Sequence, residues 1–217
     1  MTFFDQWITW LPQLSPGLTV SLSLTGLCLV FGMPFGLVLA LMIEGKIVPL
    51  RIVALLFVEI GRGAPALVLL YLLYFGFPEG GIVLSAFTTA VISLSWTTGA
   101  YSSELFRAGL AAVPRGQREA ATTSGLTGWP GFRYIILPQA LRISTPPLAS
   151  LAVTIFQTTS LAFVIAVPEL MSKAYELGSY TFEYLGVFVL TSILYGAITV
   201  AALALVRLGE RRLSRHL

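Results

Sequence analysis

The sequence predicts an all-α membrane protein with five transmembrane helices. Of its 217 residues, 56% are hydrophobic and only 11% are charged. Soluble domains carry about 25% charged residues, so this chain has too few charges to cover a water-facing surface. The charge-poor segments are continuous runs of Leu, Val, Ile and Ala. They lack the period-two alternation of a membrane β-barrel, and each is as long as a membrane-spanning helix requires.

Charged residues divide the chain into five apolar runs. In chain order they are 17–43, 52–78, 80–103, 143–168 and 184–206. The second run is interrupted by Glu59 and Arg62, and the other four contain no charge. Because lipid offers the backbone no hydrogen-bond partners, each run is predicted to be a helix.

The N-terminal segment has the features of a retained helix and not of a signal peptide. Asp5 is the only charge before Glu44, so no basic region precedes the first apolar run. Residues 1–16 contain Trp7 and Trp10, and tryptophan is enriched at membrane interfaces. We therefore expect residues 1–16 to form an interfacial segment before the first span.

Basic residues predict the orientation, because cytoplasmic loops carry an excess of Lys and Arg. Eleven of them fall on one side of the five spans, whereas the other side holds only Lys173. The eleven are Lys46, Arg51, Arg107, Arg115, Arg118, Arg133, Arg142, Arg207, Arg211, Arg212 and Arg215. This predicts an outer N-terminus and a cytoplasmic C-terminus. The basic excess is explained by topology, without a nucleic-acid partner.

Residues 108–138 form the largest predicted inner loop. Pro114 suits a helix start and Gly125 a left-handed helix end. Thr127 is expected to cap a second short helix, which Pro138 interrupts or bends. Such a helix on the inner face is either a contact for a soluble partner or a surface connector, and composition alone does not choose between them.

A set of residues in this loop resembles the EAA loop of ATP-binding-cassette importer permeases. The matching residues are Glu119, Ala120, Ala121, Gly125 and the Ile136-Leu137-Pro138 triplet. The small alanines and the glycine suit close docking and a sharp turn. By this resemblance, the four residues from Glu119 to Gly125 couple the chain to an ATPase subunit.

Further segments narrow the resemblance to permeases of the polar amino acid uptake family. The matching segments are 59–65, 99–107, 138–142 and 167–170. The resemblance implies a type I ATP-binding-cassette importer permease fold and a single permease domain over residues 1–217. It also implies a multi-pass protein of the bacterial cytoplasmic (inner) membrane that imports polar amino acids or similar small zwitterions by alternating access.

The same resemblance implies partners. They are ATP-binding-cassette ATPase subunits, a second identical or homologous permease, an extracytoplasmic substrate-binding protein and membrane lipid. The chain contains no G-x-x-x-x-G-K-[ST] sequence. We therefore expect no cofactor in this chain, ATP and magnesium being bound by the partner ATPase.

Polar residues within the spans are the candidates for function. Glu59 and Arg62 lie three residues apart, so we expect an ion pair that is either structural or part of a gate. The candidates for the substrate pathway are Thr97, Thr98, Tyr101, Gln157, Thr158, Thr159 and Ser160. The polar run 157–160 binds either an amino acid or a neighbouring helix.

Members of the resembled family commonly carry a lysine and an acidic or amide residue where this chain has Gln157 and Thr158. The loss of both charges argues against a cationic substrate at this subunit. It indicates either a neutral substrate or a second permease that supplies the charged half of the site.

Two other function classes were weighed. An intramembrane enzyme is disfavoured because the chain has one histidine, His216, and one cysteine, Cys28. The chain is therefore expected not to be an enzyme and to hold no metal. A gradient-driven secondary transporter subunit is the alternative, although such folds usually carry internal repeats and more helices.

Overall fold

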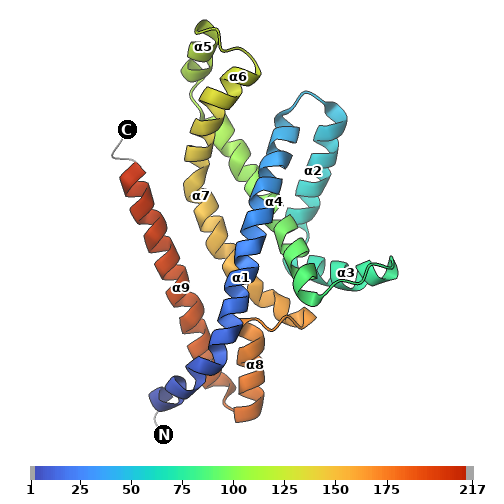
Figure 1. The fold of residues 1–217 in the computed structure, drawn as a ribbon, viewed down its shortest axis with the longest axis vertical. Coiled ribbons are helices and arrows are strands. Elements are labelled where there is room, and N and C mark those ends of the chain that lie inside the picture. The colour runs from blue at the N-terminus through green and yellow to red at the C-terminus, as the bar shows by residue number, and fades with distance from the viewer. Residues whose placement is uncertain (1–2, 214–217) are drawn as a thin grey trace.

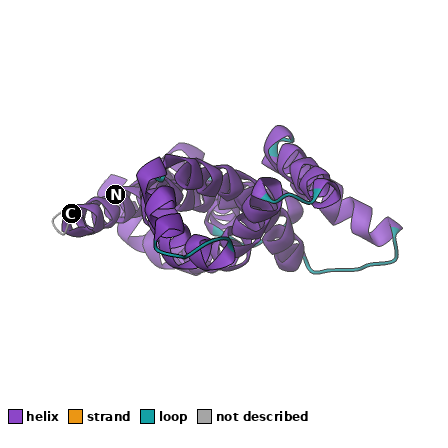
Figure 2. Ribbon diagram, turned by 90° about the horizontal axis from the view of Figure 1, so that it is seen from above, coloured by secondary structure: helices purple, strands orange, loops and turns teal. Residues whose placement is uncertain are grey.

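The computed structural model describes the backbone of residues 3–213 and the side chains of residues 6–208. Nearly all of this described part is helical, and it contains no strand (Figure 2). The predicted all-α class is confirmed. In chain order, the elements are α1 Phe3–Glu44, α2 Val48–Gly63, α3 Ala66–Glu79, α4 Ala86–Ala112, α5 Arg115–Thr123, α6 Trp129–Gly131, the π-helix η1 Phe132–Ile136, α7 Leu137–Thr158, the 3₁₀-helix η2 Thr159–Ile165, α8 Leu170–Thr181 and α9 Tyr184–Leu213 (Figure 1).

The first helix runs through the segment that was predicted to lie in the membrane interface. No loop separates residues 3–16 from the first apolar run. Pro12 and Pro16 lie inside α1, whose first turns are bent away from the rest (Figure 1). Trp10 is 5% exposed and belongs to a cluster that joins α1 to α8 and α9. The indole of Trp10 therefore packs inside the protein, and the interfacial location of residues 1–16 stays a prediction.

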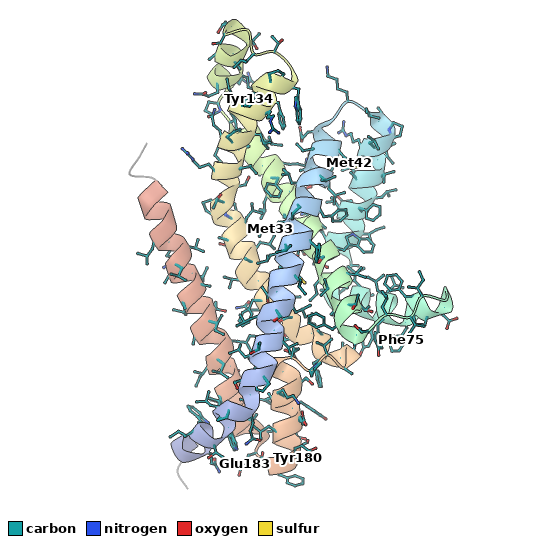
Figure 3. The ribbon with its side chains drawn as sticks, viewed as in Figure 1. Met33, Met42, Phe75, Tyr134, Tyr180 and Glu183 are labelled. Atoms are coloured by element: carbon teal, nitrogen blue, oxygen red, sulfur yellow. The ribbon has the colours of Figure 1, made fainter. Side chains whose placement is uncertain are left out.

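The second apolar run is broken, as its glycines and proline predict. α2 and α3 are bent by 110° at the break between Gly63 and Ala66. Ala64 and Pro65 have ψ angles of 136° and 134°. Proline disfavours the helical conformation in the residue before it, so the chain is extended here. α3 turns out of the bundle with Phe75 on it (Figures 1 and 3).

The central helix is α4, which contacts α1, α2, α3 and α7. The hydroxyl of Ser85 accepts a hydrogen bond from Thr88 N at 3.1 Å and caps its start. Buried hydroxyls along α4 bond to the helix itself. Thr98 Oγ1, for example, donates to Leu94 O at 2.6 Å. These bonds satisfy polar groups in a helix that is covered by its neighbours.

Glycines set the distance between α1 and α4. A Cβ atom on Gly32 would lie 2.6 Å from Thr98 Cβ, and one on Gly36 would lie 2.5 Å from Gly99 O. Membrane helices associate through such close contacts, since lipid provides no hydrophobic drive between them. The glycine pair therefore serves packing within the chain.

The predicted second short helix of the inner loop is the start of a long helix. α6, η1, α7 and η2 follow one another without a loop. The N-cap is Gly128, with φ +63°, so the predicted cap at Thr127 is wrong. Pro138 is the second residue of α7, just beyond the point where the hydrogen-bond pattern changes from π to α, and it does not separate two helices.

The long helix ends at Ile165, earlier than the apolar run predicts. Ala166 adopts a left-handed conformation with φ +62°, and its N–H bonds back to Ala162 O and Phe163 O. Val167 and Pro168 then lead into α8, which packs against α1 and α9. Tyr180 and Glu183 mark the end of the molecule farthest from α5 (Figures 1 and 3).

Three described helical stretches are long and apolar enough to cross a membrane. They are Gln6–Glu44, Trp129–Ile165 and Tyr184–Leu208. The bent pair of α2 and α3 makes a fourth candidate. α4 is not in this set. The count of five spans stays a prediction.

Candidate functional site

The break between α2 and α3 faces α4 and α7 across a cavity of about 300 Å³. Residues 62–66 form one wall, α4 forms a second and α7 a third. Four residues singled out from the sequence line this cavity: Arg62, Thr97, Tyr101 and Thr158. The fold therefore brings together side chains from three distant segments.

Arg62 is the one charged residue among the described residues that line the cavity. Its Nη1 lies 3.6 Å from Glu104 Oε1, and its Cζ lies 5.8 Å from the centre of the Tyr101 ring. Glu59 is exposed on α2. The predicted pairing of Glu59 with Arg62 is wrong, because Arg62 lies at the end of α2 and reaches across to α4.

Glu104 belongs to a longer ion-pair chain. Its Oε1 also accepts a hydrogen bond from Arg107 Nη1 at 2.9 Å. Arg107 Nε in turn donates to Glu44 Oε1 at 3.1 Å, at the end of α1. Ion pairs thus link the cavity to the ends of α1 and α2. Charged groups held in a network keep a fixed geometry better than isolated surface pairs do.

The threonine hydroxyl groups of the cavity already donate their hydrogens to the backbone. Thr97 Oγ1 donates to Ser93 O at 3.3 Å, and Thr158 Oγ1 donates to Thr154 O at 2.8 Å. A hydroxyl oxygen that donates in this way still has lone pairs to accept a hydrogen bond. The cavity therefore offers a cationic donor on the α2 side and neutral acceptors on α4 and α7.

Two predicted pathway residues do not line this cavity. Thr98 is fully buried, and its Cβ lies where α4 meets Gly32 of α1. Thr159 is also fully buried, and its Oγ1 donates to Phe156 O at 2.7 Å. Both side chains are enclosed by helix packing, and their role in the substrate pathway stays a prediction.

The polar run 157–160 points in several directions. Gln157 Nε2 donates to Thr199 Oγ1 of α9 at 3.3 Å, and Ser160 Oγ donates to Gln157 O at 2.8 Å. Neither residue lines the cavity. For Gln157, the contact with α9 supports the alternative that it joins helices. Of this run, Thr158 alone lines the cavity, because successive positions of a helix point about 100° apart.

The predicted helix and glycine stop of the inner loop form α5. Gly125 has φ +79°, its N–H bonds to Thr122 O, and Leu126 N bonds to Ala121 O at 2.9 Å. This left-handed ending satisfies carbonyls that the helix leaves free. α5 stands at one end of the molecule, beyond α4 and α7 (Figure 1).

The EAA residues of α5 divide into two faces. Glu119 and Ala120 are exposed, whereas Ala121 is 2% exposed. Ala121 Cβ lies 3.6 Å from the position that a Cβ on Gly131 would take. The small side chain of Ala121 therefore lets α5 pack on its own chain, and its role in coupling to the ATPase stays a prediction.

Glu169 is a buried residue whose role sequence reasoning missed. It directly follows the fourth apolar run, yet it is fully buried. Its carboxylate accepts hydrogen bonds from Ser21 Oγ at 3.2 Å, Tyr195 Oη at 2.9 Å, and the N–H groups of Met171 and Ser172 at 2.9 and 2.7 Å. Burial raises the pKa of Glu169, and these donors oppose that shift. The available signal in the sequence was the position of Glu169 directly after Val167-Pro168, which indicates an N-cap at the start of a helix.

Glu104 and Thr154 were also missed. Glu104 stands three residues after Tyr101 on α4, so one helical turn places both beside Arg62. Thr154 stands four residues before Thr158 on α7 and also lines the cavity. Both could have been found from the sequence, because each lies one helical turn from a residue that was predicted to line the pathway.

Comparison with known proteins places the chain in a family. Residues 32–215 match the family described as "Binding-protein-dependent transport system inner membrane component". The chain belongs to this family. The suspected resemblance is confirmed: this permease is the membrane component of an ATP-binding-cassette importer. The ATPase of such an importer is a partner, so the prediction that the chain is not itself an enzyme is confirmed as well.

Curated relatives cover most of the permease. A probable amino-acid ABC transporter permease protein of Bacillus subtilis, YckA, is 37% identical and covers 94% of this chain and 91% of its own length. The L-cystine transport system permease protein TcyB of the same organism is 38% identical, covering 94% of this chain and 88% of its own.

Solved structures agree with the fold. A chain from a structure titled "Crystal structure of an amino acid ABC transporter with histidines" superposes with a TM-score of 0.91 at 33% identity. It covers 98% of this permease and 99% of that chain. A chain of the MetNI methionine ABC transporter has a TM-score of 0.69 at 22% identity, covering 92% and 97%, and supports the fold alone.

Proposed function

We propose that this permease imports a polar amino acid or a similar small zwitterion through the cavity at the α2–α3 break. The observation that carries the proposal is the cavity lined by Arg62, Thr97, Tyr101 and Thr158. Its volume of about 300 Å³ lies at the small end of ligand sites. The printed names of the relatives, which include amino-acid and L-cystine permeases, support the same substrate class.

The chemistry of the walls matches both ends of a zwitterion. Arg62 presents guanidinium donors to a carboxylate, and such charge-assisted bonds are the stronger kind. The oxygens of Thr97 and Thr158 accept hydrogen bonds from an ammonium group. No carboxylate among the described residues lines the cavity, so a neutral amino acid fits better than a cationic one, unless a second permease adds an acidic group.

The proposed partners act at the two ends of the bundle. ATP-binding-cassette ATPase subunits, which bind ATP and magnesium, dock at α5 through the exposed Glu119 and Ala120. An extracytoplasmic substrate-binding protein meets the opposite end, near Tyr180 and Glu183 (Figure 3). The exposed apolar side chains of α2, α3 and α9 are covered by lipid or by a second permease.

The proposed topology has five spans in a bacterial inner membrane, counting α4 and the bent α2–α3 pair with the three long apolar stretches. Lys46 lies in the turn between α1 and α2, and Arg51 lies in the first turn of α2. This turn is at the end of the molecule that also carries α5 (Figure 1). This agrees with the positive-inside rule and supports a cytoplasmic α5 and an outer N-terminus.

ATP-dependent uptake tests the proposal. Vesicles would contain this chain, its ATPase and its binding protein, and radiolabelled neutral, acidic and cationic amino acids would be offered separately. We expect uptake of a neutral amino acid that requires ATP and persists when the proton gradient is collapsed.

The opposite result would favour a gradient-driven secondary transporter. Uptake without ATP that stops when an ionophore removes the gradient would contradict the proposal. A matched control is the same vesicle with an ATPase variant that binds ATP without hydrolysing it. It should show no accumulation.

A further inference from the structure

α5 is attached to α4 by an arginine. Arg118 Nη2 donates a hydrogen bond of 2.7 Å to Leu110 O. Leu110 lies in the last turn of α4, where carbonyls have no partner within the helix. A cation at this end is also favoured by the helix dipole. The bond thus joins a charged donor on α5 to the end of the central helix.

A second bond attaches α5 to α7. Gln139 Nε2 donates to Gln117 Oε1 at 3.1 Å and to Ile135 O at 2.9 Å. The bond to its own helix fixes the orientation of the Gln139 amide. Gln117 and Arg118 are neighbours in α5, so one turn of this helix is bonded to two different helices.

α5 also packs on α6 and η1. Ala121 is its one buried residue. Leu110, Val113 and Ala140 form a small buried cluster beneath it, which ties the end of α4 to the start of α7. The polar bonds of Gln117 and Arg118 are therefore a large part of what links α5 to the rest of the described chain.

Both bonded helices lead to the cavity. α4 continues as one helix from Leu110 to Tyr101, about 14 Å along its axis. α7 continues from Gln139 to Thr158, about 28 Å along its axis. Tyr101 and Thr158 lie in two different walls of the site. A displacement of α5 is thus passed to both walls through continuous helices.

We propose that Arg118 and Gln117 are positioning residues that transmit movement of α5 to the cavity walls on α4 and α7. The proposal rests on the proposed function, in which an ATPase acts on α5. Neither residue touches the substrate. Their loss should uncouple ATP hydrolysis from transport, and binding of the ATPase should survive because Glu119 and Ala120 remain exposed.

The test measures substrate taken up per ATP hydrolysed by the complete transporter in vesicles. For Arg118→Ala we expect this ratio to fall about tenfold, since a hydrogen bond from a charged group is lost. Arg118→Lys keeps the charge and a donor and should recover most of the ratio. Co-purification of the ATPase should be unchanged in both variants.

The glutamine pair provides a second measurement. Gln117→Ala and Gln139→Ala should each lower the ratio of substrate to ATP. The ratio of the double variant should be no lower than that of the more impaired single variant, because both substitutions remove the same bond. Arg142→Ala is the matched control. Arg142 is exposed on α7 and should leave the ratio unchanged.

Two results would overturn the proposal. One is a wild-type ratio in Arg118→Ala and in the glutamine double variant. The other is loss of the ATPase from Arg118→Ala, which would make Arg118 a docking residue. Failure of the proposed function would give a different result: uptake by the wild-type transporter would not depend on ATP.

Discussion

Arg62 shows how a charge that lines the cavity is held. Its guanidinium lies between Glu104 and the Tyr101 ring, and Glu104 is also bonded to Arg107. A charge at membrane depth is costly unless it is paired. Because Glu104 keeps Arg107 as a second partner, a substrate carboxylate can take the Arg62 donors without leaving Glu104 unpaired.

We predict that Arg62→Ala raises the KM for uptake by about tenfold or more, because a charge-assisted hydrogen bond is worth about 1.5–3 kcal/mol. Arg62→Lys should retain part of the affinity. Arg51→Ala, an exposed arginine of the same helix, is the control. An unchanged KM in Arg62→Ala would show that the substrate carboxylate binds elsewhere.

Glu169 is a second single residue with a large expected effect, in this case on the stability of the fold. We predict that Glu169→Ala lowers the free energy of unfolding by about 3 kcal/mol, because it removes an N-cap and leaves buried donors unpaired. The measurement is thermal unfolding of the purified permease in detergent. Glu176→Ala is the control on α8, since its pair with Lys173 is exposed and contributes little. Equal melting temperatures for both variants would contradict this role.

At the scale of elements, α4 decides the arrangement of the bundle. It packs on α1 through glycines, on the α2–α3 break through Arg62, and on α7 across the cavity. The sequence accounts for the glycine contact and the break, since both depend on the local spacing of glycine and proline. It did not predict that Thr98 and Thr97 face different helices, because neighbouring positions on a helix point about 100° apart and only the packing assigns them.

The α1–α4 contact gives a prediction with an internal control. Gly36→Ala should lower the melting temperature in detergent, since its Cβ would collide with Ser102 and Gly99, and overpacking costs about 1–3 kcal/mol. Gly26→Ala in the same helix should be neutral or slightly stabilising, because nothing lies within 4 Å of its Cβ position. Equal effects of the two variants would contradict this packing.

At the scale of the whole molecule, the proposed orientation places α5 and α8 on opposite sides of the membrane. Ser124, next to α5, and Ser179, on α8, are both exposed. In a Cys28→Ala background, a membrane-impermeant thiol reagent should label Ser179→Cys in cells with a permeabilised outer membrane. Ser124→Cys should be labelled in inverted vesicles instead. The reverse pattern would contradict the predicted topology.

The sequence by itself determined the helical class, the family and the break in the second apolar run. These follow from composition, from motif spacing and from glycine and proline, which act locally along the chain. The tertiary structure decided which polar groups meet. It paired Arg62 with Glu104 and not with Glu59, buried Glu169, and turned Ala121 inward. Such choices depend on contacts between distant segments, which one-dimensional spacing does not specify.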